Sequence, residues 1–250
     1  MKTFFRDVKR NLPLLIMALP AVIYIIMFNY VPMFGIVIAF KDFNYRKGIF
    51  GSEWCGLDNF KFLLESGDLA MMLRNTIAYN IVFIITGIII AITLAILFDA
   101  LGKTMLNRIN QTIVIMPHFL SMVVVSYFVY SFLSVDKGVI NQILKTLGIG
   151  TIDWYSEPKF WPFILWIVKS WSTVGWSSVI YYSTIKGFSS DYYEAAKIDG
   201  ASWWRQVKNI TIPLLKPTII VLLITNIGHI LTSGVDLFYL IPRNSVHYTL

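Results

Sequence analysis

Five long apolar stretches alternate with polar segments along the chain. Residues 11–40 contain no charged side chain at all. Each stretch is long enough to cross a bilayer as a helix, which takes about 20 apolar residues. The predicted spans cover residues 12–40, 76–101, 112–134, 161–187 and 218–241. The pattern therefore predicts an all-α integral membrane protein, with a single transmembrane domain over residues 1–250.

Composition supports a membrane protein and argues against several other classes of protein. Of the 250 residues, 56% are hydrophobic and 14% are charged, which is unlike a soluble domain. The first apolar run is about twice as long as the core of a signal peptide, so we interpret it as an uncleaved span. The single cysteine, Cys55, excludes an internal disulfide framework and a cysteine-built metal site. We expect neither a metal nor a cofactor.

The net charge of +7 comes from basic residues that gather near the ends of the predicted spans. Those on one side of the predicted membrane are Lys2, Arg6, Lys9, Arg10, Lys103, Arg108, Lys186, Lys197, Arg205, Lys208 and Lys216. Loops on the other side hold fewer basic residues, and acids balance them. Because basic loops stay in the cytoplasm, this asymmetry predicts a multi-pass protein with a cytoplasmic N-terminus and a cytoplasmic segment 188–217. It explains the charge better than nucleic-acid binding does.

The polar segment 188–217 carries the signals of two short helices. Asp191 and Glu194 have the spacing of a capping box, which predicts a helix start. Asp199 and Gly200 supply a turn, because glycine accepts the left-handed backbone that ends a helix. Ser202 can cap a second helix. Pro213 and Pro217 follow, and we expect them to end that helix before the fifth span begins.

The same segment resembles the EAA loop of ABC-importer permeases. Glu194-Ala195-Ala196 is followed after three residues by Gly200, and after nine more by Ile210-Thr211-Ile212-Pro213, with Ile212 in place of the usual Leu. The resemblance implies that this loop docks on an ATP-hydrolysing partner. The residues that it marks for coupling are Glu194, Ala195, Ala196, Asp199, Gly200, Ile210 and Pro213.

The resemblance also implies an architecture and a set of partners. Permeases of this kind have a type I core of six helices, of which five are predicted here, so the chain looks one span short. The implied partners are a second permease subunit, ABC-type ATPase subunits, an extracellular solute-binding protein and a sugar. The run KSWSTVGWSSVIYYSTIKG and the later IPRN resemble the LplB-type polysaccharide-permease branch of the maltose-permease-like family, whose members handle oligosaccharides.

Few ionisable side chains fall inside the predicted spans. His118, Lys169 and His229 lie on the third, fourth and fifth spans. An ionisable group at bilayer depth is costly unless it faces a cavity or a partner, so each is a candidate for a translocation path. Lys169 could instead extend its ammonium group toward the interface, and either histidine could simply bond a backbone carbonyl. A lysine in the path would suit an acidic sugar such as a uronate.

The sugar-permease resemblance extends this set of path candidates. It implies substrate contacts at His118, Lys169, Ser172, Thr173, Trp176 and His229. Trp171, Tyr181 and Tyr182 could also stack on sugar rings, but near span ends they are typical of the aromatic belt. Of the aromatic residues, we therefore assign a pore role to Trp176 alone.

Enzyme signatures are weak in this chain. Gly102-Lys103-Thr104 is similar to the end of a phosphate-binding loop, but Leu97 stands where that loop needs a glycine. We expect no catalytic residues, with ATP hydrolysed on a separate partner. Two other classes stay open at this point: a membrane-embedded enzyme acting on lipid-linked saccharide, and a passive channel. Neither explains the EAA-like loop, which favours an importer.

Overall fold

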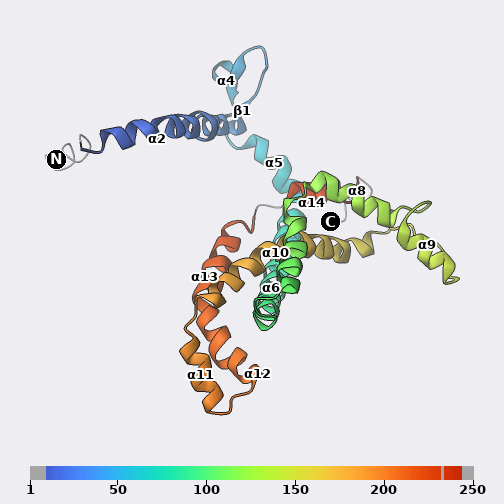
Figure 1. The fold of residues 1–250 in the computed structure, drawn as a ribbon. Helices are drawn as coiled ribbons and strands as arrows, with labels where there is room; N and C mark the ends of the chain where they lie inside the picture. Colours follow the sequence, from blue (N-terminus) through green and yellow to red (C-terminus); the bar gives the residue numbers. More distant parts are fainter. Residues whose placement is uncertain (1–9, 232–233, 244–250) are drawn as a thin grey trace. The chain divides into compact units, whose positions relative to one another are not determined.

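A computed structural model describes residues 10–231 and 234–243 (Figure 1). These described residues divide into two compact units, one up to Met71 and one from Met72 onward. The single-domain prediction stays a prediction. Lys2, Arg6 and Lys9, which belong to the predicted cytoplasmic charge, lie outside the described residues.

The first unit is one long helix followed by a small hairpin. The helix runs through α2 (Leu12–Ile25), η1 (Ile26–Tyr30), α3 (Val31–Met33) and η2 (Phe34–Phe40), which together form the 29-residue stretch Leu12–Phe40. Strand β1 (Lys41–Asp42) pairs antiparallel with β2 (Glu53–Trp54) around α4 (Gly48–Gly51), and α5 (Asp58–Glu65) follows. The Phe40 and Trp54 rings stack at 5.8 Å and hold the hairpin at the helix end. The predicted span 12–40 matches this helix.

The second unit is helical throughout its described part. In order its elements are α6 (Asp68–Ala100), whose first residues precede the boundary, α7 (Met105–Ile115), η3 (Met116–Phe119), α8 (Met122–Leu133), α9 (Val139–Thr146), η4 (Pro158–Phe160), α10 (Trp161–Lys186), α11 (Ser190–Ile198), α12 (Trp203–Gln206), η5 (Val207–Thr211), α13 (Ile212–Gly228) and α14 (Val235–Leu240). Figure 1 shows α11 and α12 at one end of this unit and α8 and α14 at the other.

Helix α10 is the centre of the second unit. One buried cluster joins it to α6, α8 and α14 through Trp161, Leu165, Val168 and their neighbours. A second cluster joins it to α6 and α13 around Ala91, Tyr181 and Leu215. Small residues let membrane helices approach closely, and Gly175 of α10 lies against the backbone of Val114 in α7.

The third predicted span, 112–134, falls on a bent pair of helices. The helix starts earlier, at Met105, and η3 and α8 meet at a bend of 104°. Leu120 leaves helical geometry with ψ 135°, and Ser121 then caps α8 by accepting a hydrogen bond from the Val124 amide at 3.4 Å. A serine cap starts a new helix in a new direction.

The helices of this region also differ in their bounds from the fifth predicted span, 218–241. One continuous helix runs from Trp203 to Gly228 and passes through Pro213 and Pro217, which were expected to end it. The π-helical turn Val207–Thr211 ends two residues before Pro213, and such a turn rearranges the hydrogen bonds that a proline would otherwise disrupt. The chain then turns before α14.

Among the described residues, four helices are long and apolar enough to cross a membrane, and the bent pair makes a fifth if it counts as one span. The fourth predicted span, 161–187, agrees with α10 to within one residue. The second begins earlier than predicted, at Asp68.

Candidate substrate cavity and coupling loop

A cavity of about 290 Å³ opens inside the second unit, between α6, α10, α14 and the end of α13. Lys169, Thr173 and His229, three of the six predicted path residues, line it. Lys169 and Thr173 lie four residues apart on α10, and helical residues at this spacing share a face. The cavity therefore collects polar groups that are distant in sequence.

The charge in this cavity is one-sided. Lys169 brings an ammonium group, and the described lining residues include no Asp or Glu. Among the described residues Lys169 forms no ion pair. A half-buried cation without a carboxylate partner favours an anionic group in the space beside it.

Tyr181 is a lining residue whose position near a span end predicts a place in the aromatic belt. Its side chain is only 1% exposed, and its Oη has no hydrogen-bond partner in the described part of the chain. Buried hydroxyls are nearly always bonded, so a water or ligand hydroxyl in the cavity would complete this one. The signal was available: Tyr181 continues the four-residue spacing of Lys169, Thr173 and Ser177, all of which line the cavity.

Asparagine side chains from α6 and α13 also belong to the polar lining, and they were not among the predicted path residues. Asn80 on α6 donates from Nδ2 to the carbonyl oxygen of Ile230 at 3.0 Å, which ties α6 to the chain just after α13. Asn226 on α13 donates to the carbonyl oxygen of Leu222 at 2.8 Å. Both amides are thereby held in fixed orientations at the cavity wall.

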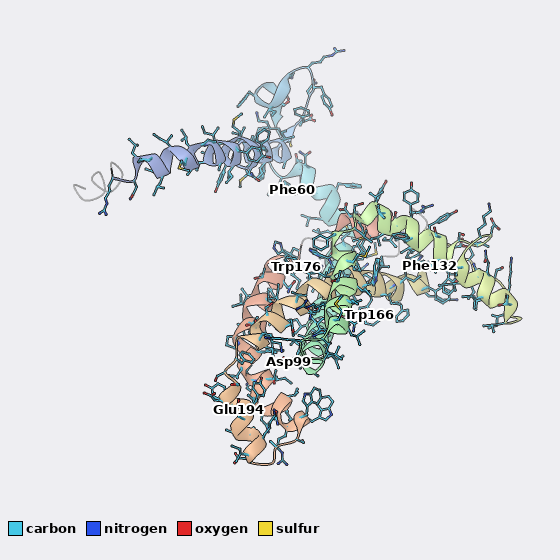
Figure 2. All side chains as sticks on the ribbon, viewed as in Figure 1. Phe60, Asp99, Phe132, Trp166, Trp176 and Glu194 are labelled. Atoms are coloured by element: carbon cyan, nitrogen blue, oxygen red, sulfur yellow. The ribbon has the colours of Figure 1, made fainter. Side chains whose placement is uncertain are left out.

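The other three predicted path residues do not line this cavity. Ser172 is buried, and its hydroxyl donates to the carbonyl oxygen of Lys169 at 3.0 Å. The His118 ring stacks on Trp176 with centroids 5.0 Å apart, and both side chains are exposed in this chain. Figure 2 labels Trp176. His118 and Trp176 thus form an exposed pair where η3 meets α10, separate from the polar cavity.

The segment 188–217, which is predicted to couple to an ATPase, forms a helical hairpin, as expected. The cap of its first helix, α11, differs from the prediction: the N-cap is Ser189, whose Oγ accepts from the Asp191 amide at 3.3 Å, instead of Asp191 itself. A serine is an equally good cap and lies two residues earlier. Glu194 is exposed on α11, where Figure 2 labels it.

The turn of the hairpin has the geometry that the sequence predicts. Gly200 has φ +74°, in the left-handed region that glycine accepts. The Gly200 amide donates to Lys197 and the Ala201 amide to Ala196, which is a Schellman helix end. Ser202 is the N-cap of α12 by position, but its side chain makes no capping hydrogen bond.

Two polar contacts hold the hairpin in place. Tyr193 Oη lies 3.0 Å from Thr211 Oγ1, so α11 is bonded to η5. Gln206 donates to the carbonyl oxygen of Ala201 at 2.9 Å across the turn. Large apolar side chains are exposed at the tip: Ile198 is 87% exposed and Trp204 is 72% exposed. An exposed apolar surface of this kind is typical of a protein interface.

Comparison with known proteins identifies the family. Residues 84–241 match the model of the family described as binding-protein-dependent transport system inner membrane component. The chain belongs to this family. It is therefore a permease component of a transport system that depends on a binding protein. It is a multi-pass membrane protein and not an enzyme.

Similar proteins from Bacillus subtilis (strain 168) cover most of the chain. The polygalacturonan/rhamnogalacturonan transport system permease protein YteP is 38% identical over 91% of this chain and 71% of its own length. The protein LplB is 33% identical over 94% of this chain and 74% of its own length. The resemblance to the LplB-type branch is thus confirmed.

A solved structure confirms the type I importer fold. It is a crystal structure of a bacterial ABC transporter involved in the import of the acidic polysaccharide alginate. Its matching chain is 31% identical, with a TM-score of 0.88 over 98% of this chain and 82% of that chain. A second structure, of a bacterial alginate ABC transporter in complex with an alginate pentasaccharide-bound periplasmic protein, matches with a TM-score of 0.86 over 97% of this chain.

Proposed function

We propose that this permease subunit imports oligosaccharides that carry acidic sugar residues, and that the cavity around Lys169 is part of their path. The observation that carries this proposal is the one-sided charge of the cavity, with one ammonium group and no carboxylate in its described lining. The names of two relatives support it, because polygalacturonan and alginate are acidic polysaccharides. In the cavity, Lys169 would pair with a sugar carboxylate while Tyr181 and Thr173 face sugar hydroxyls.

The segment 188–217 would couple this path to ATP hydrolysis. The N-terminus and the hairpin lie in the cytoplasm in this proposal, as the basic residues on that side suggest. Glu194 would pair with a basic surface of an ATPase subunit, and Gly200 would set the angle between α11 and α12. Ala195, Ala196, Asp199, Ile210 and Pro213 belong to the same docking segment. A second permease subunit and an extracellular binding protein complete the importer.

This proposal is favoured over the two other classes of protein. A membrane-embedded enzyme acting on lipid-linked saccharide and a passive channel both leave the exposed hairpin without a role. The family to which the chain belongs consists of transport components, which favours the importer over both.

Uptake by cells that carry the assembled importer tests the path. The Lys169→Gln variant removes the charge from a hydrogen bond to the sugar carboxylate. It should therefore lower uptake of uronate oligosaccharides by about tenfold or more, with a smaller effect on neutral ones. Lys145→Gln, at an exposed lysine of α9, is the matched control and should change neither. Equal losses for acidic and neutral sugars would overturn the acidic-sugar assignment.

Copurification from membranes tests the coupling. The wild type should bring down an ATPase and a second permease, and Glu194→Lys should lose the ATPase alone. Asp191→Lys, an exposed acid near the start of the same helix, is the control for charge reversal on α11. Recovery of the ATPase with Glu194→Lys would remove Glu194 from the docking surface.

A further inference from the structure

A second pocket, of about 430 Å³, is lined by residues at and after the end of α8. Figure 1 shows α8 at the end of the unit away from α11 and α12. The volume of the pocket is in the range of pockets that bind small ligands. The polar residues that line it are Tyr130, Ser134, Asp136, Lys137, Asp153 and Tyr155. None of these residues has a role in the transport path described above.

Arg243 is exposed beside this pocket, where it contacts the ring of the lining residue Tyr130. Its guanidinium carbon is 3.8 Å from the ring centroid of Tyr130 and 5.2 Å from that of Tyr127. Stacking on rings fixes the plane of the guanidinium and leaves its edge N–H groups available. In the described part of the chain Arg243 forms no ion pair. The arginine is therefore an oriented cation without a carboxylate partner.

The backbone holds Arg243 in an unusual position. Its φ of +51° is the one positive value among the described non-glycine residues. Such a conformation persists where the surrounding structure enforces it, and it is common at ligand sites. Here the preceding Ile241 and Pro242 are fully buried and anchor the chain on that side. The side chain is thus presented by a fixed backbone.

Tyr155 provides a second observation, independent of Arg243, that points to ligand binding. Its Oη is buried and has no hydrogen-bond partner in the described ranges. Burial raises the pKa of Tyr155 to about 12, so the hydroxyl stays protonated and can donate a hydrogen bond. Buried hydroxyls are nearly always bonded, and the residue that carries this one is part of the pocket lining.

The pocket combines donors and acceptors in the way that a hydroxylated anion requires. Asp136 can accept hydrogen bonds from ligand hydroxyls, Tyr155 can donate one, and Arg243 matches a carboxylate with two parallel N–H groups. Asp153 accepts from Ser156 Oγ at 2.7 Å, which fixes its carboxylate at the pocket wall.

We propose that this pocket is a second saccharide site, which binds an acidic sugar residue by pairing its carboxylate with Arg243 and its hydroxyls with Tyr155 and Asp136. The inference rests on the proposed function for its substrate class. It adds an outer site, on the side opposite the coupling hairpin, that receives the oligosaccharide before the cavity around Lys169. Helix α14 connects the two sites, because Leu237 and Phe238 line the cavity and Arg243 lies three residues past the end of the helix.

Equilibrium binding to the assembled importer, in nanodiscs of zwitterionic lipid without binding protein, tests the site. The probes are oligogalacturonate and a neutral oligosaccharide of equal length. Arg243→Gln should weaken oligogalacturonate binding by about tenfold or more, because a bidentate charged pair is lost. Arg243→Lys should restore part of it, and Tyr155→Phe should weaken both probes a fewfold. Arg74→Gln, at an exposed arginine of α6, is the matched control.

The variants also separate this inference from the proposed function. Loss of binding in Arg243→Gln within a Lys169→Gln background supports two distinct sites. If Lys169→Gln lowers uronate uptake while Arg243→Gln leaves binding unchanged, the outer site is wrong and the proposed function stands. If neither variant distinguishes acidic from neutral sugars, both are wrong. If Arg243→Gln causes a defect only with anionic lipid, Arg243 binds lipid and the saccharide site is wrong. If the variant only weakens affinity for the sugar-free binding protein, Arg243 contacts that protein and the saccharide site is again wrong.

Discussion

The ammonium nitrogen of Lys186 lies 2.6 Å from a carboxylate oxygen of Asp99, and this ion pair joins the last turn of α10 to the last turn of α6. Figure 2 labels Asp99 close to the hairpin that carries Glu194. The two side chains are 39% and 36% exposed, so solvent screens the pair. Its role is therefore to fix the ends of two helices next to the coupling hairpin, with little effect on global stability.

Removing this ion pair should cost little free energy of unfolding. Exposed ion pairs contribute about 0–1 kcal/mol, so Asp99→Asn, Lys186→Gln and the double variant should give a coupling energy below about 1 kcal/mol in a double-mutant cycle. Thermal unfolding in detergent measures it. A coupling of several kcal/mol would contradict the conclusion that solvent screens this pair.

The close approach of α10 to α7 should be sensitive to a single methyl group. A Cβ at Gly175 would strike the carbonyl group of Val114 and lie 3.0 Å from the Cα of Ile115. Overpacking of this kind costs about 1–3 kcal/mol, so Gly175→Ala should lower the unfolding temperature of the purified protein. Gly87→Ala, at a helical glycine of α6 with open space around it, should leave the temperature unchanged or raise it.

The loop between α8 and η4 depends on one buried amide. Asn141 is 1% exposed, donates to the carbonyl oxygens of Ser134 at 3.2 Å and Ile152 at 2.9 Å, and accepts from the Ile152 amide at 3.0 Å. At about 1 kcal/mol for each hydrogen bond, Asn141→Ala should destabilise the protein by roughly 2–3 kcal/mol.

The neighbouring Gln142 provides the control for this loop. Its side chain is exposed and makes one hydrogen bond, to the carbonyl oxygen of Lys137. Gln142→Ala should therefore change the free energy of unfolding by no more than about 0.5 kcal/mol. Limited proteolysis of the loop should follow the same order. Equal sensitivity of the two variants would contradict the role of Asn141.

The sequence predicted those parts of the fold that local pattern determines. The limits of the helices over 12–40 and 161–187 follow from runs of apolar residues, and Gly200 follows from the backbone that a helix end requires. The bend before Ser121 and the passage of one helix through Pro213 depend on which hydrogen bonds the neighbouring turns can supply. Apolar periodicity carries no signal for these, so the helix bounds differ from the predicted third and fifth spans.

The candidate site was predictable to a similar extent. Lys169 and His229 stood out because ionisable residues in apolar spans are rare, and both line the cavity. Tyr181 was missed because its position near a span end fits the aromatic belt equally well. Trp176 was selected for its mid-span position, but only the packing of α10 against η3 determines that it meets His118 outside the cavity.

The turn of the coupling hairpin should tolerate little besides glycine. Gly200 has open space around it, so a side chain would meet no atoms, and the cost of replacement comes from its φ of +74° alone. Gly200→Ala should therefore cost roughly 1–2 kcal/mol and reduce ATP-driven uptake. Gly200→Asn should cost less, because asparagine tolerates the left-handed region. Equal uptake defects for Ala and Asn would point to side-chain exclusion by a partner instead of backbone strain.

The contact between Tyr193 and Thr211 should transmit force across the hairpin. It joins α11 to the helix that continues through α13 to the cavity, so its loss would let α11 move without moving that helix. Tyr193→Phe removes the hydroxyl alone and should lower stability by only about 1 kcal/mol. We expect it to leave the ATPase bound but to uncouple sugar uptake from ATP hydrolysis. Thr211→Val should do the same, and the double variant should be no worse than either. Additive losses of uptake would show that the two residues act separately, and a lost ATPase would make Tyr193 a docking residue instead of a force-transmitting one.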